Sequence, residues 1–483
     1  MHTLPPTLPK IRLAASLAAA LALSGCAIGP DYQRPSSWLP TAFSEAPPAA
    51  AQQDATPSSA VDARWWSLFA DTTLNELVDQ ALENNADLRT AIARLEQANA
   101  LAREAGAAFF PEIDGEASGS KRKLSTKTAT WTSSSTKFVN ARSGALTTSY
   151  ELDIWGRVRR TNESAQASLL SSQYSRDAIR LTVAGLVSSN YLALRAYDAE
   201  LAVTAESLAS REASLKLVKT RVDAGLVSPL DLYQAEGAQA ALQAQQADLR
   251  RLRALAEHQL ALLTAKPDLT IAAGDIRQLP LPPVPPAGLP ADLIETRPDV
   301  REAEQKLIAA NANIGVAKAG YYPTFSLTGS VGTESKTLGD LFGAGANTWS
   351  IGLGLLMPII DFGRTSARVD QAKALNEQSL IAWQNTLQTA YKEVRDALVN
   401  LRENGNAETA QNIRVYNTQQ ALDIANRRYD AGYSGYLEVL DAQRSNNDAL
   451  LAMIATRQAR LVAAVELFKA IGGGWKDQAP KRG

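Results

Sequence analysis

The distribution of proline most constrains what this chain can fold into. No proline occurs in residues 112–228, 230–266 or 359–479. Because proline is excluded from helix interiors, each of these runs can form uninterrupted helix. From about Arg157 to Asp223, apolar residues recur at steps of three and four: Leu194, Tyr197, Leu201, Ala205, Leu208, Leu215, Val218 and Val222. This near-heptad spacing predicts a coiled-coil-like helix. Roughly 65 residues at a rise of 1.5 Å would extend about 100 Å, which no globular core requires.

The chain also repeats itself. The turn sequence Asp-Ala-Gly that ends at Gly225 recurs at Gly432 in the same helical context. Three further stretches of the first half match the second half: Asp87-Leu88-Arg89 with Asp299-Val300-Arg301, Ala107-Ala108-Phe109-Phe110-Pro111 with Ala319-Gly320-Tyr321-Tyr322-Pro323, and Trp155-Gly156-Arg157 with Phe362-Gly363-Arg364. A repeat of this length indicates a duplication rather than a solenoid period. Each half is predicted to contain a helix, two strands, a very long helix, a turn and a second long helix.

Both Asp-Ala-Gly sequences are predicted to be turns of helical hairpins. Each glycine falls just past an incoming helix, and a capped helix start follows. In the first copy, Ser228, Pro229 and Asp231 fall at the N-cap, N1 and N3 positions. This is a capping-box pattern with proline where its missing N–H does no harm. In the second copy, Gly435 and Glu438 take the N-cap and N3 positions.

Two segments, 143–154 and 348–360, alternate between apolar and polar residues, and we expect their strand partners near 112–124 and 324–333. One face of the first segment carries Leu146, Tyr150, Leu152 and Ile154, and the other carries Ser149, Glu151 and Asp153. One face of the second carries Trp349, Ile351, Leu353, Leu355 and Met357. Transmembrane barrel strands require such a pattern, with lipid on one side and water on the other. A half-buried soluble sheet fits the periodicity equally well.

The number of strands carries a further implication. Four strands cannot close a barrel, and open sheet edges are forbidden in lipid. If these strands lie in a membrane, several chains must therefore share one barrel. The Ser-, Thr- and Gly-rich segments 125–136 and 334–346 are predicted to be loops at the outer surface.

The N-terminus resembles that of a bacterial lipoprotein. Lys10 and Arg12 precede the apolar run 13–23, which fits a signal peptide and is too short to span a bilayer as a mature helix. The run leads into Leu-Ser-Gly-Cys26, which resembles a lipobox, so Cys26 is predicted to be the acylated first residue of the mature chain. Ala27, rather than aspartate, follows it, as in lipoproteins sorted to the outer membrane. Several acyl chains on one residue give a stable anchor. An ordinary signal peptide with a chance cysteine is the alternative.

These patterns divide the chain into segments. Residues rich in Pro, Ala, Ser and Gln follow Cys26 and predict an extended tether without a core of its own. The expected segments are a signal peptide (1–25), a lipidated tether (26–62), a first structural repeat (63–266), an inter-repeat linker (267–297), a second structural repeat (298–474) and a C-terminal tail (475–483).

Composition excludes several kinds of protein. The 49 basic and 50 acidic residues give no support for nucleic-acid binding, which needs a basic excess. Two histidines, His2 and His258, and one cysteine exclude disulfides and His–Cys metal sites within one chain. His258 lies in an Ala-, Leu- and Arg-rich helical run and is predicted to be a helix-surface or packing residue. We find no nucleophile–base pair and no phosphate-binding Walker loop, so we expect no enzyme, no metal and no cofactor beyond the covalent lipid on Cys26.

Together these residues resemble the TolC-type outer-membrane efflux proteins, in particular the lipoprotein branch that serves drug-proton antiporters. The resemblance covers nearly the whole mature chain. The motifs that carry it are the lipobox, the duplication, Phe-Phe-Pro, Tyr-Tyr-Pro, Asp-Phe-Gly-Arg and the two Asp-Ala-Gly turns, followed by Leu-Asp-Leu and Leu-Glu-Val-Leu-Asp-Ala-Gln. It implies a mainly α fold with a small transmembrane β part, closed only as a homotrimer. A shared twelve-stranded β-barrel would continue into a long periplasmic α-helical barrel, with Pro267 to Pro290 near its equatorial belt.

The resemblance also assigns roles at the periplasmic tip. Residues matching the two turns that contact a periplasmic adaptor protein are Gly225, Leu226, Val227, Gly432, Tyr433 and Ser434. Asp231 matches a gate carboxylate, which would form a ring of three in a trimer, repel like charges and attract cations. Capping alone would equally explain its presence. Some family members carry a latching arginine where this chain has Ser434, so that latch is in doubt here, whereas Tyr429 could still contribute to a gate.

The function that the resemblance implies is a passive exit duct. An inner-membrane pump and its adaptor would deliver drugs or other small molecules, and adaptor binding would favour the open tip. Three alternatives stay open: a type I secretion channel, a metal-efflux channel and a lipid-anchored coiled-coil scaffold without a pore. The lipobox argues mildly against secretion. Three methionines and two histidines are too few to supply a series of soft ligands along a metal pathway.

Overall fold

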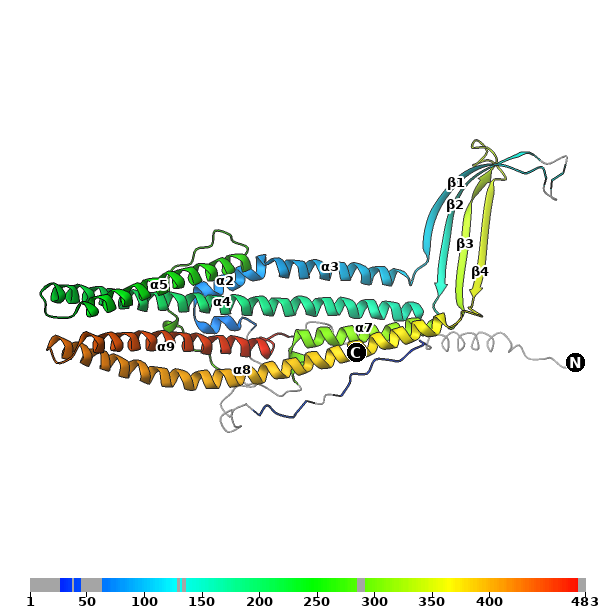
Figure 1. The fold of residues 1–483 in the computed structure, drawn as a ribbon. Helices are drawn as coiled ribbons and strands as arrows, with labels where there is room; N and C mark the ends of the chain where they lie inside the picture. The colour runs from blue at the N-terminus through cyan, green and yellow to red at the C-terminus, as the bar shows by residue number, and fades with distance from the viewer. Residues whose placement is uncertain are drawn as a thin grey trace. The chain divides into compact units, whose positions relative to one another are not determined.

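The computed structural model describes residues 27–36, 39–44, 63–127, 131–132, 136–284 and 292–476. The signal peptide, Cys26, parts of the tether and of the β1–β2 loop, and the end of the tail therefore lie outside the described residues. The first half contains η3 (Trp65–Phe69), α2 (Thr72–Asn84), α3 (Ala86–Ala107), β1 (Glu112–Lys123), β2 (Phe138–Leu152), α4 (Arg157–Asp223) and α5 (Pro229–Leu263). The second contains η4 (Ile276–Gln278), α6 (Leu293–Thr296), α7 (Pro298–Ala319), β3 (Thr324–Ser335), β4 (Asn347–Leu356), α8 (Arg364–Asp430) and α9 (Tyr436–Ala470) (Figure 1).

Three pairs of helices have the same length in the two halves. α3 and α7 each have 22 residues, α4 and α8 each have 67, and α5 and α9 each have 35. The predicted helix from Arg157 to Asp223 is confirmed with both bounds. No helix among the described residues is both long and apolar enough to cross a membrane.

The strand predictions need four corrections. β2 begins at Phe138, five residues before the expected start, and β4 ends at Leu356, so Ile360 and Met357 lie beyond it. Pro358, which cannot donate a ladder hydrogen bond, follows the end of β4. β3 continues to Ser335, so Glu334 belongs to a strand rather than to the predicted loop. Ile154 likewise lies beyond the end of β2.

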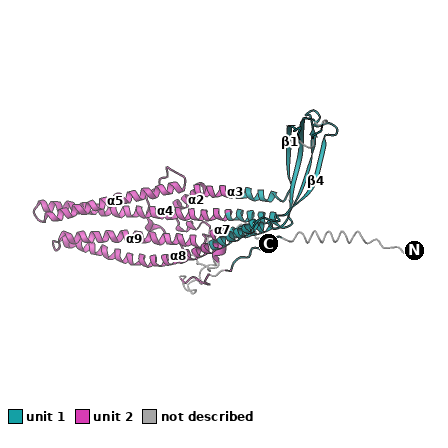
Figure 2. Ribbon diagram, turned by 45° about the vertical axis from the view of Figure 1, so that its right-hand side comes forward, with its two compact units in different colours: residues 1–35, 96–171, 303–382 teal, residues 36–95, 172–302, 383–483 magenta. Residues whose placement is uncertain are grey.

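The chain forms two compact units (Figure 2). Unit 1 comprises residues 1–35, 96–171 and 303–382, and unit 2 comprises residues 36–95, 172–302 and 383–483. Each unit combines segments of both halves of the chain. Equivalent parts of the two sequence repeats therefore pack with each other rather than forming two separate bodies.

Unit 1 contains a four-stranded antiparallel sheet in the order β1-β2-β3-β4 (Figure 1). Directly paired residues lie on the same face of a sheet. The register places on one face Ile113, Leu146, Tyr150, Leu152, Phe325, Leu327, Val331, Trp349, Ile351, Leu353 and Leu355. The other face carries Glu112, Asp114, Glu116, Ser118, Thr147, Ser149, Ser326, Thr328, Ser330, Thr348 and Ser350. One apolar face and one polar face therefore run across all four strands.

Backbone geometry marks the exit from β2 into α4. Gly156 has a φ of 79°, which turns the chain, and the Asp153 carboxylate accepts from the N–H groups of Val158 and Arg159 at 3.0 and 2.9 Å. The helix therefore starts with capped donors. Phe362 and Gly363 repeat the positive φ, at 53° and 85°, before α8.

Residues 28–34 of the tether pack on unit 1. The Ile28 N–H donates to the Trp155 carbonyl at 3.0 Å, and Asp31 pairs with Arg160 at 2.6 Å. Arg34 pairs with the buried Glu304 of α7 at 2.6 Å. The segment that follows the predicted lipid anchor is thus fastened to the helices next to the sheet.

Unit 2 is held by aromatic packing and by buried ion pairs. Trp65 stacks on Phe468 with ring centroids 5.5 Å apart, at the point where the chain enters the body. Asp198 of α4 pairs with Arg253 of α5 at 2.7 Å, and Arg253 donates to the Ile271 carbonyl of the inter-repeat segment at 2.7 Å. His258 is exposed on α5, as expected for a helix-surface residue.

The second hairpin has an equivalent set of ion pairs between its two helices and a hydrogen bond to the inter-repeat segment. Glu408 of α8 pairs with Arg457 and Arg460 of α9 at 3.0 and 2.7 Å. Arg457 also donates to the Leu279 carbonyl at 2.6 Å. Because these groups are largely buried, breaking one partner would leave an uncompensated charge. Each helical hairpin therefore donates a hydrogen bond to the segment that joins the repeats.

Candidate functional site

Both hairpin turns end their first helix in the same way. Gly225 has a φ of 69°; its N–H donates to the Val222 carbonyl at 2.9 Å, and the N–H of Leu226 donates to Arg221 at 2.8 Å. This pair of bonds is a Schellman motif, which satisfies the last carbonyls of the helix. At the second turn, Gly432 has a φ of 77° and its N–H donates to Tyr429 at 3.1 Å, while the N–H of Tyr433 donates to Arg428 at 2.8 Å. Glycine is needed at both positions because a side chain would strain a left-handed φ.

The starts of the outgoing helices agree only in part with expectation. Ser228 is the N-cap of α5, with Pro229 following, as predicted. Its hydroxyl, however, accepts from the N–H of Leu230 at 3.1 Å rather than from Asp231, so the predicted capping box is wrong in this bond. The Asp231 carboxylate forms no hydrogen bond with another described residue and is half-buried.

Gly435 is the N-cap of α9, as predicted, and supplies no side-chain bond. Glu438 lies in the first turn of α9, and its carboxylate pairs with Arg428 at the end of α8 at 2.8 Å. This ion pair spans the turn and is well exposed, so it contributes little to stability on its own.

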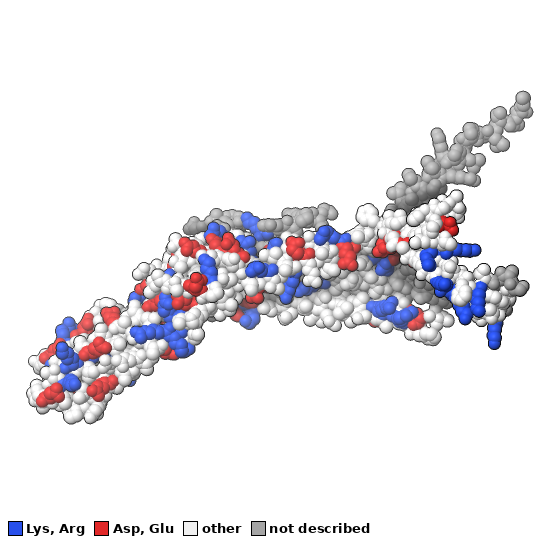
Figure 3. Space-filling model, turned by 90° about the horizontal axis from the view of Figure 1, so that it is seen from above, with Lys and Arg blue, Asp and Glu red and all other residues white. Residues whose placement is uncertain are grey.

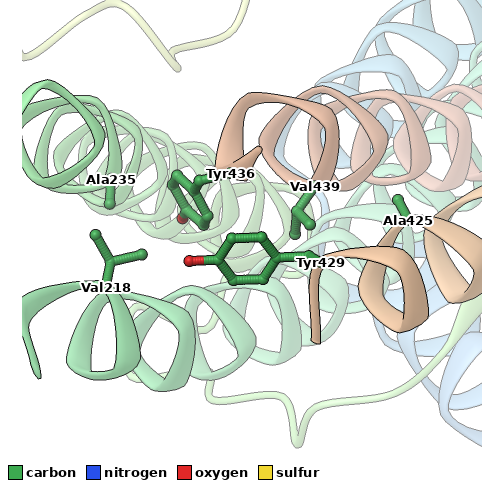
Figure 4. Close-up of a cluster of buried hydrophobic side chains, with 6 residues drawn as sticks. All are labelled: Val218, Ala235, Ala425, Tyr429, Tyr436 and Val439. Carbon is green, nitrogen blue, oxygen red and sulfur yellow. The ribbon is translucent and has the colours of Figure 1, made fainter. Parts of the chain in front are cut away.

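The four long helices meet just behind the turns in a buried cluster, which we call the tip cluster (Figure 4). Its members are Val218 of α4, Ala235 of α5, Ala425 and Tyr429 of α8, and Tyr436 and Val439 of α9. Both hairpins contribute to it, so the cluster can stay intact only while the two hairpins remain packed on each other.

Tyr429, the predicted gate tyrosine, lies at the centre of the tip cluster and is only 7% exposed. Its ring lies 5.8 Å from that of Tyr436, and the Arg221 guanidinium lies 4.5 Å from its centroid, close enough for a cation–π interaction. The Tyr429 hydroxyl, which points toward Val218 in Figure 4, is buried and has no hydrogen-bond partner among the described residues. Burial raises the pKa of the Tyr436 hydroxyl, and the nearby Asp231 charge acts in the same direction, although the Arg211 charge opposes it.

The residues predicted to contact an adaptor lie at the turns, and most are open to solvent. Leu226 is 74% exposed and Tyr433 is 80% exposed, and both glycines are exposed. Val227 and Ser434 are half-buried. Large apolar side chains that protrude from a turn suit contact with another protein.

Sequence reasoning missed several members of the tip. Tyr436 and Arg221 were not singled out, although Tyr436 takes the helical position that Pro229 takes in the first copy, and Tyr429 takes that of Val222. A comparison of the two copies for aromatic differences would have revealed both tyrosines. Val218 appeared only as a member of the near-heptad pattern.

Arg211 was also missed. It is 6% exposed and lines a cavity of about 460 Å³ between α4, α5 and α9. Burial lowers the pKa of its guanidinium, and Asp448 and Tyr436 lie close enough to oppose that shift. Polar groups of Gln245, Asp441, Arg444 and Asn447 also line the cavity. None of these features forms a nucleophile–base arrangement.

Comparisons with known proteins agree with this geometry. The model of the family described as outer membrane efflux protein matches residues 77–266 and 289–473. This chain belongs to the outer membrane efflux protein family, and its fold is of the TolC type. It is similar to the outer membrane protein OprJ of Pseudomonas aeruginosa, with 35% identity over 472 residues that cover 96% of each chain. It is also similar to the solvent efflux pump outer membrane protein SrpC of Pseudomonas putida, with 34% identity over 459 residues, covering 95% of this chain and 97% of that protein.

A solved structure gives the same result for the fold. The CmeC outer membrane channel of Campylobacter jejuni superposes with a TM-score of 0.87 at 25% identity, covering 94% of this chain and 96% of that one.

Proposed function

We propose that this protein is the outer-membrane exit channel of an efflux system and conducts small molecules passively to the exterior. The observation that carries the proposal is the sheet of unit 1, whose register gives one continuous apolar face and one continuous polar face. A sheet that divides lipid from water needs both. The relatives are named for efflux of solvent, toluene and antibiotics, which supports small organic compounds as substrates.

The edges of the sheet support a shared barrel. β1 and β4 are the edge strands of the sheet, and each pairs with one neighbouring strand among the described residues of this chain. Because unpaired backbone groups are costly in lipid, both edges need partners from other copies. We propose a homotrimer, in which three four-stranded sheets close a barrel of twelve strands and the long helices continue the duct.

The tip cluster would act as the gate. We propose that the exposed turn residues, including Leu226 and Tyr433, contact a periplasmic adaptor protein that binds the open tip more tightly than the closed one. Opening would then separate hairpins that the tip cluster holds together. Asp231, half-buried and without a hydrogen bond in the described part of the chain, would face its copies in a trimer and attract cations.

An inner-membrane pump, which we propose to be a drug-proton antiporter, would supply the energy. Cys26 would carry the acyl anchor. No catalytic role is proposed for any residue of this chain.

Two neighbouring residues of β4 offer a matched test. Ile351 lies on the apolar face and Ser350 on the polar face. A lysine at the lipid face near the bilayer midplane costs about 2–4 kcal/mol, whereas a lumen position tolerates charge. Ile351→Lys should therefore strongly reduce insertion into liposomes, and Ser350→Lys should insert and conduct with altered ion selectivity.

Conductance of liposomes and drug susceptibility of a deletion strain are the measurements. If both lysine variants insert equally well, the sheet does not face lipid. If purified wild-type protein never conducts, even when the tip cluster is disrupted, a scaffold without a pore is the better description.

A further inference from the structure

The first strand pair carries a charge pattern that the exit channel alone does not explain. Residues 117–150 contain six basic residues and no acidic one: Lys121, Arg122, Lys123, Lys127, Lys137 and Arg142. The whole first hairpin, residues 112–152, also contains four acidic residues, all at the end next to the helices: Glu112, Asp114, Glu116 and Glu151. The equivalent hairpin of the second repeat, residues 324–356, contains Lys336 as its one basic residue, together with Glu334 and Asp340. The excess of positive charge is therefore specific to one of the two copies. In Figure 3, blue side chains gather over the end that carries the strands.

Register assigns these residues to faces. Gly119 pairs with Arg142, Lys121 with Asn140 and Lys123 with Phe138. Counting by twos from Ile113 and Leu146, these three pairs lie on the apolar face of the sheet. Arg122, in contrast, pairs with Val139 on the polar face. We call Lys121, Lys123 and Arg142 the basic girdle.

The side chains of the basic girdle, which belong to the apolar face of the sheet, form no ion pair with a carboxylate of the described residues. The Arg142 side chain crosses Gly119, where an added Cβ would lie 3.3 Å from Nη1. That Nη1 donates only to backbone carbonyls, at 3.2 Å to Ala141 and 3.5 Å to Ser120. The Lys121 ammonium lies 5.6 Å from the ring centroid of Phe138, which is 53% exposed. No ion pair joins the girdle to any acidic residue of the described chain.

The position along the strands fits the headgroup layer of a membrane. On β2 the apolar face extends from Leu152 to Leu146, about 20 Å at 3.4 Å per residue. Arg142 follows about 14 Å further along the strand, which becomes about 10 Å of height at the usual barrel tilt. Basic side chains at this level can direct their charged ends to lipid headgroups while their stems cover apolar surface.

The order of helices and strands along the chain indicates at which leaflet of the membrane the basic girdle would lie. β1 follows α3, and β2 leads into α4, so the helices attach at the end of the strand pair opposite the girdle. If the helices are periplasmic, as the proposed function holds, the girdle lies at the outer leaflet. The lipids of that leaflet bear phosphate groups on sugars, and charge complementarity favours them as the partner.

We propose that the basic girdle binds the phosphate groups of an outer-leaflet glycolipid and so fixes an annular lipid to the first hairpin of each subunit. The inference rests on the proposed function, because it requires the apolar face to be in the outer membrane. Of the other three basic residues, Arg122 lies on the polar face, and Lys127 and Lys137 lie between β1 and β2; these three take no part.

The test compares two triple variants of the full-length protein that lose the same charge. Lys121→Gln, Lys123→Gln and Arg142→Gln together remove the girdle. Arg122→Gln, Lys127→Gln and Lys137→Gln together are the control in the same hairpin. Each protein is reconstituted in phosphatidylcholine nanodiscs that contain bis-phosphorylated lipid A or its dephosphorylated form, and retained lipid A is measured by native mass spectrometry. Conductance of the same preparations is recorded in planar bilayers.

Each basic residue near an anionic surface changes binding about fivefold, so the girdle variant should bind phosphorylated lipid A roughly a hundredfold more weakly than wild type. The control should bind within about threefold of wild type, and added salt should weaken wild-type binding. Equal retention by the girdle variant and wild type, an equal loss in the control, or equal binding of dephosphorylated lipid would each overturn the inference.

The conductance record separates two other failures. A girdle variant that retains lipid A but changes ion selectivity would assign these charges to the channel mouth and overturn the inference alone. A wild-type protein that neither inserts nor conducts would overturn the proposed function, and the inference with it.

Discussion

Replacing Tyr429 with phenylalanine tests the gate most directly. The Tyr429 hydroxyl lies buried in the tip cluster without a hydrogen-bond partner among the described residues. A hydroxyl buried in this way costs about 1–3 kcal/mol. Phenylalanine keeps the ring and removes that cost. Tyr429→Phe should therefore stabilise the packed tip by about 1 kcal/mol relative to any tip in which the two hairpins separate.

The same gain should appear in gating. If opening separates the hairpins, about 1 kcal/mol reduces the open population about fivefold. Single-channel recording in planar bilayers measures that population, and chemical denaturation of the purified protein measures stability. Tyr433→Phe is a matched control, because Tyr433 is on the same turn but is 80% exposed, so loss of its hydroxyl should change neither quantity.

Tyr429→Ala should act in the opposite direction. It removes the ring that contacts Tyr436 and Arg221, and loss of a buried aromatic side chain costs about 3–5 kcal/mol. The tip should then open more readily. An open population that rises in Tyr429→Phe, or a fall in its stability, would refute the reasoning, since the hydroxyl would then have a partner in the closed trimer.

Three further predictions concern other parts of the chain. Cys26→Ser should abolish acylation, measured by metabolic labelling with a palmitate analogue, yet leave trimers intact on cross-linking, because the barrel itself holds the membrane; loss of trimers would show that assembly needs the anchor. Gly432→Ala should lower the free energy of unfolding by about 1 kcal/mol, because its φ of 77° strains any other residue. Gly237→Ala, inside α5 where an added Cβ meets nothing within 4 Å, should not lower it, since alanine favours helix over glycine; equal losses in denaturation would contradict this. Burial raises the pKa of Glu200 from 4.5 to about 6, so its charged form destabilises the fold as the pH rises through that window. Glu200→Gln should thus raise the free energy of unfolding by about 1 kcal/mol at pH 8, after allowance for partial exposure, and leave it unchanged below about pH 4.5, where both states are protonated; a gain that is the same at both pH values in denaturation curves would exclude this cause.

The long helices were predictable because local signals agree with one another. The absence of proline permits α4 over its full length, Gly156 turns the chain before it, and Gly225 ends it. The strands were harder to bound. β2 extends back to Phe138 through residues 138–142, where the alternation of apolar and polar residues fails because Asn140 and Arg142 lie on the face that carries apolar residues further along the strand.

The contacts that hold the tip were not predictable from periodicity. Tyr436 and Val218 come from helices far apart in sequence, and a pattern within one helix does not say which other helix completes its packing. The ion pair between Glu408 of α8 and Arg457 of α9 likewise joins residues of two different helices. The prediction for Ser228 was only approximate because a serine at the N-cap can bond to either of two nearby N–H groups.

Differences between the two copies are informative because duplication supplies an internal control. Where the copies agree, as in both Schellman turns and in the equal lengths of the long helices, the residues are needed for the fold that both halves share. Where the copies differ, the shared fold cannot explain the difference. Tyr429 takes the helical position of Val222, so the buried hydroxyl is a property of the second hairpin alone.

The same logic applies to the sheet. Both strand pairs need an apolar face, yet only the first carries an unbalanced positive charge at its far end. A duct built from three copies would thus alternate two kinds of hairpin around its circumference. If the charge served only solubility, either hairpin would suffice. Its restriction to one hairpin, with Lys121 and Arg142 on the apolar face of that hairpin, is what binding at defined positions around the barrel requires.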